Sequence, residues 1–88
     1  MRSLFVHLGK NAVIRSDHIV VIIDWDTLLE SETNRLYLER AKKNRLVKDI
    51  AEGQPHSAVI TTNAIYLSTV SSTTLKKRAE NPQYLALE

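Results

Sequence analysis

The chain has 88 residues, of which 43% are hydrophobic and 25% charged, and a formal net charge of +2. This is ordinary globular composition, and so short a chain has room for only one core, which argues against disorder and against two domains. The absence of cysteine excludes a disulfide scaffold, a thiolate metal site and a cysteine nucleophile. We expect one domain over residues 1–81 and a loose tail at 82–88.

The longest apolar run, Ile19–Ile23, has the length of a strand and is too short to cross a bilayer. The N-terminus lacks the hydrophobic region of a signal peptide. We therefore expect a cytoplasmic protein that does not enter a membrane.

Three strands are predicted before residue 25. Residues 4–8 alternate in hydrophobicity, residues 12–15 follow a turn at Gly9, and residues 18–24 are apolar on both faces. A strand that is apolar on both faces is either covered by other elements on both faces or faces a partner chain. A small domain has few elements with which to cover both faces. Self-association is therefore expected, and the predicted contact residues are Ile19, Val21, Ile23 and Leu36.

A long helix is predicted next. It begins at a capping residue, either Thr27 or Ser31, and runs to about Asn44. Helical spacing groups its core-facing side chains on one side and leaves Leu36 well away from them. The predicted core-facing side chains are Tyr37, Leu38 and Ala41.

The second half of the chain predicts three strands and a short helix. Residues 46–51 form one strand, and residues 57–61 and 65–69 form a hairpin whose turn includes Asn63, a residue that tolerates positive φ. Ser71 or Ser72 then caps a helix that ends near residue 79. The resulting order predicts an α+β domain with a mostly antiparallel sheet, one main helix and a short C-terminal helix.

Positive charge gathers in two segments. Residues 31–45 hold five basic and two acidic residues, and Lys76, Lys77 and Arg78 follow one another. Pairs four positions apart, Arg35–Glu39 and Glu39–Lys43, are expected to neutralise part of the first segment. At most two of the three consecutive cations can meet one surface. Such segments are compatible with a phosphate-rich partner and equally with solvated helix faces.

No residue set specifies an enzyme. Asp24 and Asp26 would lie on one face of a strand and could hold a divalent cation, but two carboxylates are too few ligands. The only histidines, His7, His18 and His56, match no zinc spacing. Helix capping accounts for the hydroxyl run that starts at Ser71. We expect neither catalysis nor a cofactor nor a metal.

Five short segments, in this order, carry a resemblance to a known family: residues 5–9, 17–20, 57–61, 65–68 and 71–79. Together they resemble the extracellular matrix regulatory proteins of spore-forming bacteria (Rem A and Rem B), and the last segment is most similar to the B type. The resemblance covers roughly residues 4–79. It implies a cytoplasmic transcriptional regulator of biofilm-matrix genes, with a fold like the LytTR DNA-binding domain, that assembles into rings and displays arginines to DNA.

This chain departs from the family pattern at the arginines. The A type carries them just before the third strand and after the glycine that follows the fifth element, and those positions here are His18 and Gln54-Pro55, with Ser57 at a further one. None of these side chains is a dependable phosphate clamp, so any DNA binding should be weak and insensitive to sequence. The residues expected to contact DNA are Lys10, Arg15, His18, Gln54, His56, Lys76, Lys77 and Arg78.

Two functions are therefore open. The first is an oligomeric, DNA-associated regulator of matrix genes, and the second is an oligomeric scaffold or regulatory partner of another regulator that does not itself bind DNA. The substituted arginines favour the second. Sensing of a metal or small molecule at Asp24 and Asp26 ranks below both.

Overall fold

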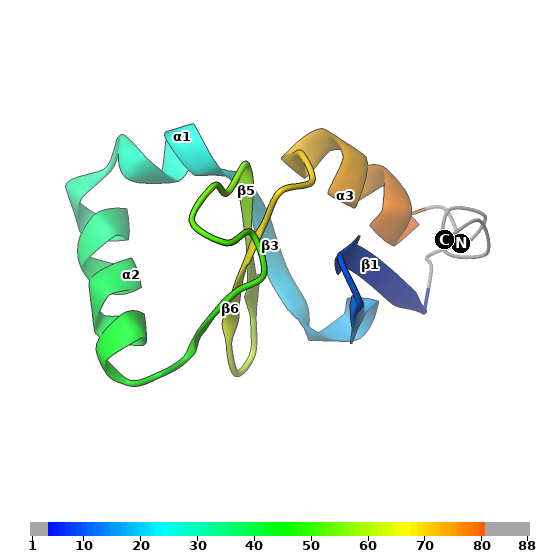
Figure 1. The fold of residues 1–88 in the computed structure, drawn as a ribbon, viewed down its shortest axis with the longest axis horizontal. Helices are drawn as coiled ribbons and strands as arrows, with labels where there is room; N and C mark the ends of the chain where they lie inside the picture. Colours follow the sequence, from blue (N-terminus) through cyan, green and yellow to red (C-terminus); the bar gives the residue numbers. More distant parts are fainter. Residues whose placement is uncertain (1–3, 81–88) are drawn as a thin grey trace.

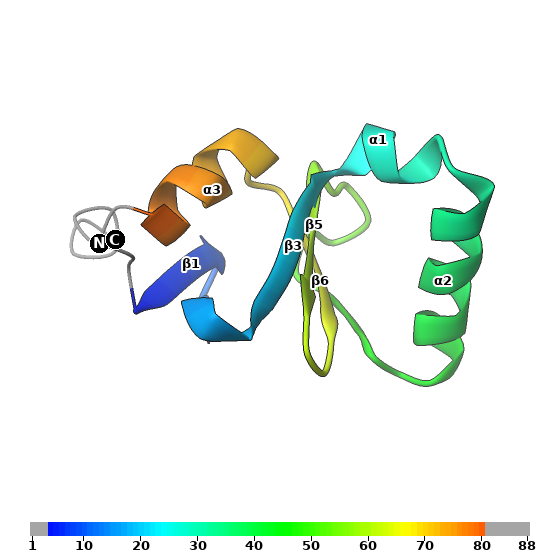
Figure 2. The same ribbon diagram turned by 180° about the vertical axis from the view of Figure 1, so that it is seen from behind.

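The computed structural model describes residues 4–80. A four-stranded sheet stands at the centre, with two helices on one side and a hairpin and a third helix on the other (Figures 1 and 2). The α+β class predicted from sequence is confirmed. The strands are β1 (Phe5–Gly9), β2 (Ala12–Arg15), β3 (Ile19–Asp24), β4 (Val47–Asp49), β5 (Ser57–Thr61) and β6 (Ile65–Ser68), and the helices are α1 (Trp25–Leu29), α2 (Glu32–Lys43), α3 (Ser72–Glu80) and the 3-10 turn η1 (Ser16–His18).

The central sheet has the strand order β3-β5-β6-β4, and β1 and β2 form a separate antiparallel pair. β4 pairs with β6 in parallel, and the other two pairings of the central sheet are antiparallel. β4 has three residues and not the six predicted, because the Asp49 carboxylate accepts backbone hydrogen bonds from Ala51 (2.9 Å) and Gly53 (3.1 Å) and turns the chain there. The expectation of a largely antiparallel sheet is confirmed.

The two faces of the central sheet bury separate hydrophobic clusters. In β5, Ala58 faces one cluster and Val59 faces the other, as expected from the alternation of side chains along a strand. α1 and α2 cover the first cluster, and the β1–β2 hairpin and α3 cover the second. The buried members of the first are Leu28, Leu38, Ala41, Ala51, Ala58, Ile65 and Leu67, and those of the second are Val6, Leu8, Ile22, Val59 and Leu75.

Two helices stand where one was predicted. The Asp24 carboxylate accepts a hydrogen bond from the backbone N–H of Thr27 (3.3 Å) and caps the short α1. The Ser31 hydroxyl accepts one from Asn34 (3.3 Å) and caps α2. Of the two proposed starts of the long helix, Ser31 is therefore the correct one.

One member of the predicted core-facing set is wrong. Leu38 and Ala41 are buried, whereas Tyr37 is 54% exposed. Tyr37 precedes Leu38 by one residue and so points about 100° away from it round the helix, to the margin of the buried face. There its ring borders a hollow and remains in contact with solvent.

The β5–β6 turn is closed by a side chain. The Thr61 hydroxyl accepts a hydrogen bond from the Ala64 N–H (3.0 Å) and donates one to the Ala64 carbonyl (2.8 Å). Asn63 has no positive φ, so the reason given for this turn from sequence is wrong although the hairpin itself is confirmed. The described non-glycine residues with positive φ are Lys10 (48°), Arg45 (59°) and Glu52 (54°).

Buried hydroxyls tie the layers together. The Ser68 hydroxyl donates to the Leu8 carbonyl of β1 and accepts from the Val70 N–H (3.0 Å), and the Ser57 hydroxyl donates to the Val70 carbonyl (2.7 Å). Ser71 caps α3 by accepting from the Thr74 N–H (3.2 Å). The predicted tail at 82–88 lies outside the described residues. In residues 4–80, no helix combines the length and the hydrophobicity needed to cross a bilayer.

Candidate nucleic-acid interface

Arg15 and His18, two of the predicted DNA contacts, flank Asp17 in η1. The Arg15 guanidinium donates two hydrogen bonds to the Asp17 carboxylate, at 3.0 and 2.8 Å, and lies 5.9 Å from the centre of the Phe5 ring. These hydrogen bonds lower the pKa of Asp17 and raise the pKa of Arg15. The His18 imidazole lies 3.8 Å from the same carboxylate. Arg15 is exposed, but its charge is already balanced.

Lys10 is also paired. It stands in the turn between β1 and β2 in a left-handed conformation and forms an ion pair with Glu52. Glu52 lies in the loop between β4 and β5. In the same loop Gln54 and His56 are exposed, and Pro55 between them is half-buried. Lys10 and Gln54 therefore belong to one region of the surface, and an acidic side chain shares it.

The basic run of α3 divides between surface and interior. Lys76 and Lys77 are exposed, whereas Arg78 is half-buried and donates a hydrogen bond of 2.8 Å to the His7 carbonyl. Consecutive helical residues point in different directions, and from sequence at most two of the three were expected to meet one surface. Two cations of α3, not three, face the solvent.

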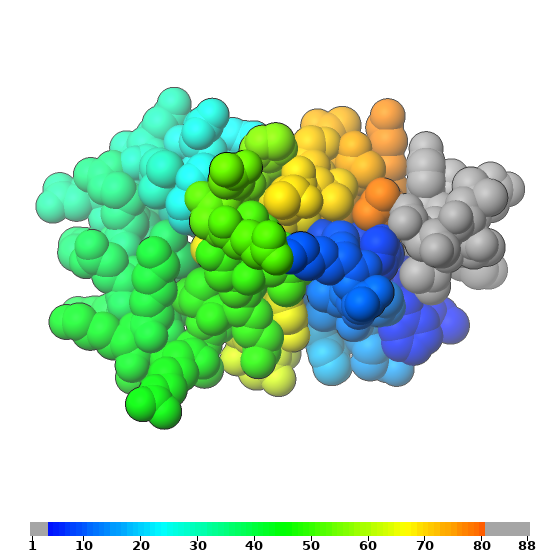
Figure 3. All heavy atoms as spheres, viewed as in Figure 1, coloured from blue at the N-terminus to red at the C-terminus, as the bar shows by residue number. Residues whose placement is uncertain are grey.

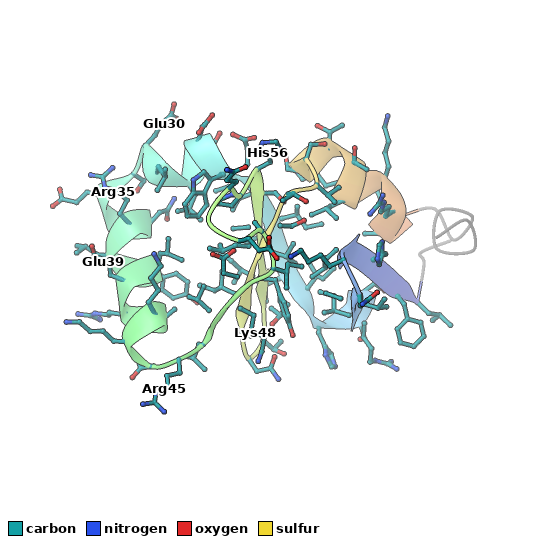
Figure 4. The ribbon with its side chains drawn as sticks, viewed as in Figure 1. Glu30, Arg35, Glu39, Arg45, Lys48 and His56 are labelled. Carbon is teal, nitrogen blue, oxygen red and sulfur yellow. The ribbon has the colours of Figure 1, made fainter. Side chains whose placement is uncertain are left out.

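One subunit does not bring all of the predicted contacts together. His18 directly precedes β3, and His56 directly precedes β5, which runs antiparallel to β3. The two histidines therefore lie at opposite ends of the sheet, one beyond each end of the span of about 17 Å from Ile19 to Asp24. Figure 4 places His56 at the upper edge of the molecule.

The predicted oligomer contacts are placed unequally. Ile19 packs against the second hydrophobic cluster and Ile23 against the first, so both are half-buried within their own chain. Val21 and Leu36 are exposed, at 42% and 53%. Residues 19 and 21 are separated by a break in the pairing register, which leaves Val20 even more exposed.

The two carboxylates considered for a cation do not share a strand face. Asp24 ends β3 and caps α1, and Asp26 lies inside α1. No cluster of three potential metal ligands occurs in residues 4–80. Capping accounts for Asp24, which corrects the strand geometry assumed from sequence.

A further set of exposed cations lies at the end of α2 and in β4. The ion pairs predicted for Arg35–Glu39 and Glu39–Lys43 are not present among residues 4–80, and the Arg35 guanidinium instead donates a hydrogen bond to the Leu29 carbonyl. The charge total of residues 31–45 predicted a basic segment, but the spacing of four also predicted that Glu39 neutralises part of it. The exposed cations concerned are Arg40, Lys42, Lys43, Arg45 and Lys48.

The chain is similar to known proteins over almost all of this structure. The family model for extracellular matrix regulatory protein A-like proteins matches residues 5–79. The chain is also 34% identical over 77 residues to extracellular matrix regulatory protein B of Bacillus subtilis (strain 168), which covers 88% of this chain and 91% of that protein. The matched span begins with β1 and reaches into the last turn of α3, so it includes both hydrophobic clusters.

Proposed function

The chain belongs to the extracellular matrix regulatory protein A-like family, and on that premise we propose that it is a non-enzymatic, cytoplasmic regulator of extracellular matrix genes that acts as an oligomer in contact with DNA. The observation that carries the proposal is the distribution of exposed apolar side chains. A family match gives the general role, whereas these side chains indicate how copies of the chain meet.

The large exposed hydrophobic side chains of residues 4–80 form two groups. The first, which we call the α2 patch, consists of Leu36, Tyr37 and Leu46, on α2 and just after it. Tyr37 and Leu46 border one hollow, and Leu36 lies apart from them on the helix. The second, the β3 patch, consists of Leu4, Phe5, Val13, Val20 and Val21, on or beside the hairpin and on the edge strand β3. In Figure 1, α2 and the hairpin lie at opposite ends of the described fold.

Two different patches, one on the α2 side of the central sheet and one on the side of the hairpin and α3 (Figure 1), favour head-to-tail contact. Such heterologous contacts produce a ring when the rotation closes and a filament when it does not. The β3 patch borders a groove of about 260 Å³ between β3 and α3, whose apolar lining includes Ile19, Val21 and Ala79. A protruding Leu36 from a second copy is a suitable occupant, and burying one leucine stabilises the contact by roughly 1.5–3 kcal/mol.

Contact with DNA is proposed through phosphates. Exposed cations and the resemblance to the A type support it, but the family's arginine positions hold His18, Gln54 and Pro55 here. A single subunit then makes few charge-assisted contacts, and repeated subunits multiply them along one duplex. The proposed binding is accordingly weak, sensitive to salt and indifferent to sequence.

The alternative is an oligomeric scaffold that contacts another regulator and not DNA. A specific observation favours it: three of the predicted contacts have other partners in this chain. Lys10 pairs with Glu52, Arg15 pairs with Asp17, and Arg78 donates to the His7 carbonyl.

Two measurements test the proposal. Light scattering coupled to gel filtration at tens of micromolar protein should give a multiple of the 10.0 kDa chain mass, and a monomer contradicts the oligomer. A gel shift on matrix-promoter and scrambled duplexes should occur equally with both at low salt and disappear by about 300 mM, roughly twice physiological ionic strength. An oligomer that shifts neither duplex at low salt supports the scaffold, and promoter-selective binding at 300 mM contradicts weak binding.

A further inference from the structure

The strongest unpaired positive charge in residues 4–80 lies where α2 ends. Five cations stand between positions 40 and 48, no acidic residue interrupts them, and all five are exposed. None forms an ion pair with another described residue. We call this surface the α2 corner, and it consists of Arg40, Lys42, Lys43, Arg45 and Lys48.

The fold turns this run of charge outward. Arg45 adopts a left-handed conformation with φ of 59°, its N–H bonds the Lys42 carbonyl (3.0 Å), and the Leu46 N–H bonds the Ala41 carbonyl (2.8 Å). The chain therefore reverses after the helix and enters β4. Figure 4 shows Arg45 and Lys48 in the lower part of the molecule, and in Figure 3 the end of α2 protrudes at the lower left.

Stabilisation of the helix end explains only part of this cluster. Cations in the last turn of a helix interact favourably with its dipole, which accounts for Arg40, Lys42 and Lys43. The effect fades within one turn, so it does not account for Arg45 beyond the helix or for Lys48 in β4.

The α2 corner and His18 lie at the same end of the central sheet, where β3, β4 and β6 begin. Two backbone hydrogen bonds connect them through the β5–β6 turn: Ile65 N–H to the Leu46 carbonyl (2.8 Å) and Thr62 N–H to the His18 carbonyl (3.1 Å). Three strand spacings separate β3 from β4, so residues 18 and 45 stand about 14 Å apart. That span equals about four base pairs along one DNA strand.

We propose that the α2 corner is the main phosphate-contact surface of this chain for double-stranded DNA. This inference rests on the proposed contact with DNA and specifies where it occurs. Lysines are depleted at protein–protein contacts, and three of the five cations are lysines, so the composition favours a phosphate backbone over an acidic protein. The corner supplies positive charge at the same end of the central sheet as His18.

The test compares two double variants that each remove two positive charges. Arg45→Asn with Lys48→Gln alters the corner, and Asn tolerates the left-handed conformation at position 45. Lys76→Gln with Lys77→Gln alters the competing surface, because these exposed lysines of α3 are also predicted DNA contacts. Thermal unfolding and light scattering should show that the corner variant keeps the wild-type fold and mass, and the same measurements are made on the α3 variant, because Lys76 lines the groove beside β3.

Binding to a random duplex is then measured from about 50 to 200 mM salt. The corner variant should show a slope of log K against log salt that is shallower by about 0.9 for each lost contact, about 1.8 in total for one subunit. The α3 variant should show a smaller change of slope than the corner variant.

A loss confined to the α3 variant would overturn the inference and leave DNA contact standing. A wild-type protein that ignores the duplex at low salt would overturn both the inference and the proposed DNA contact. If that protein binds poly-glutamate and the corner variant does not, the corner instead accepts an acidic protein segment.

Discussion

The guanidinium group of Arg78 donates a hydrogen bond of 2.8 Å to the backbone carbonyl of His7, which lies 71 positions earlier in the chain. This contact joins the last turns of α3 to β1, the strand that covers the second hydrophobic cluster. It also separates Arg78 from Lys76 and Lys77, which remain exposed.

Replacing Arg78 should therefore weaken folding more than DNA contact. For Arg78→Ala we expect the free energy of unfolding to fall by about 1.5–3 kcal/mol, the range for a hydrogen bond from a charged group. Lys77→Ala is the control and should change it by less than about 0.5 kcal/mol. Urea unfolding measures both, and equal effects of the two variants would show that the Arg78 contact contributes little.

Ser68 is expected to be costly to replace. Its hydroxyl serves both the Leu8 carbonyl and the Val70 N–H and is fully buried, so Ser68→Ala deprives two backbone groups of a partner. The free energy of unfolding should fall by about 1–3 kcal/mol for each group left unsatisfied. Thr73→Ala, at an exposed position of α3, should leave it nearly unchanged. A Ser68→Ala protein as stable as wild type would contradict this reading of the buried network.

Asp24 distinguishes helix capping from cation binding. Asn also caps helices well, so Asp24→Asn should keep wild-type stability, whereas Asp24→Ala should lose about 1 kcal/mol. Thermal unfolding with and without added calcium or magnesium is the measurement. Stabilisation of wild type by either ion, abolished in both variants, would restore the cation site.

Asp17 should restrain any DNA contact made by Arg15. Asp17→Asn removes the balancing carboxylate, so duplex affinity at low salt should rise and its salt slope should steepen by up to about 0.9 per subunit. Glu30→Gln, which removes an exposed negative charge from the turn between α1 and α2, is the control and should have a smaller effect. An unchanged slope for Asp17→Asn would show that Arg15 does not touch phosphate.

The same pair has a pH dependence of defined sign. The pKa of Asp17 is lower in the folded chain than in the unfolded one, because Arg15 stabilises the charged carboxylate. Its contribution to stability is present above the unfolded pKa and is lost as pH falls through the folded pKa. Mild acidification therefore leaves Arg15 paired, and the substitution is the better way to release it.

Head-to-tail assembly can be tested by complementation. Leu36→Asp removes the α2 patch and Val21→Asp removes the β3 patch, so each variant alone should lose the wild-type oligomer. The Leu36→Asp variant keeps its β3 patch, and the Val21→Asp variant keeps its α2 patch. When the two are mixed, these patches should form one contact and give a heterodimer that cannot grow further. Light scattering on the mixture measures this, and two variants that stay monomeric when mixed would contradict the pairing of these patches.

Periodicity predicted the elements well, because each buried strand and the core of α2 depend on residues close together in sequence. The hairpin of residues 57–68 and the position of Leu38 are examples. The parallel pairing of β4 with β6 was not predictable. β5 lies between these strands in the sequence, but in the sheet β4 and β6 are direct neighbours. α1 was missed because its five residues carry too little pattern, although Asp24 is a recognisable capping residue.

The candidate site was harder to predict for a different reason. Charge totals identified the basic segments, but pairing depends on side-chain geometry. Spacing of four suggested that Glu39 neutralises Arg35 and Lys43. In the structure the ion pairs instead join Lys10 to Glu52 and Arg15 to Asp17. The position of His18 at one end of the sheet and His56 at the other also follows only from strand order.

The two edges of the central sheet differ in how they meet other strands. β4 exposes Lys48 and Asp49 at two of its three positions, and charged side chains on an edge discourage pairing with another chain. β3 has no charged residue from Ile19 to Ile23, and only its irregular register protects it. Two copies that joined their β3 edges would present only β4 edges outward, so growth of a continuous sheet would stop at a pair. The fold thereby limits amyloid-like extension while leaving its exposed valines available for assembly.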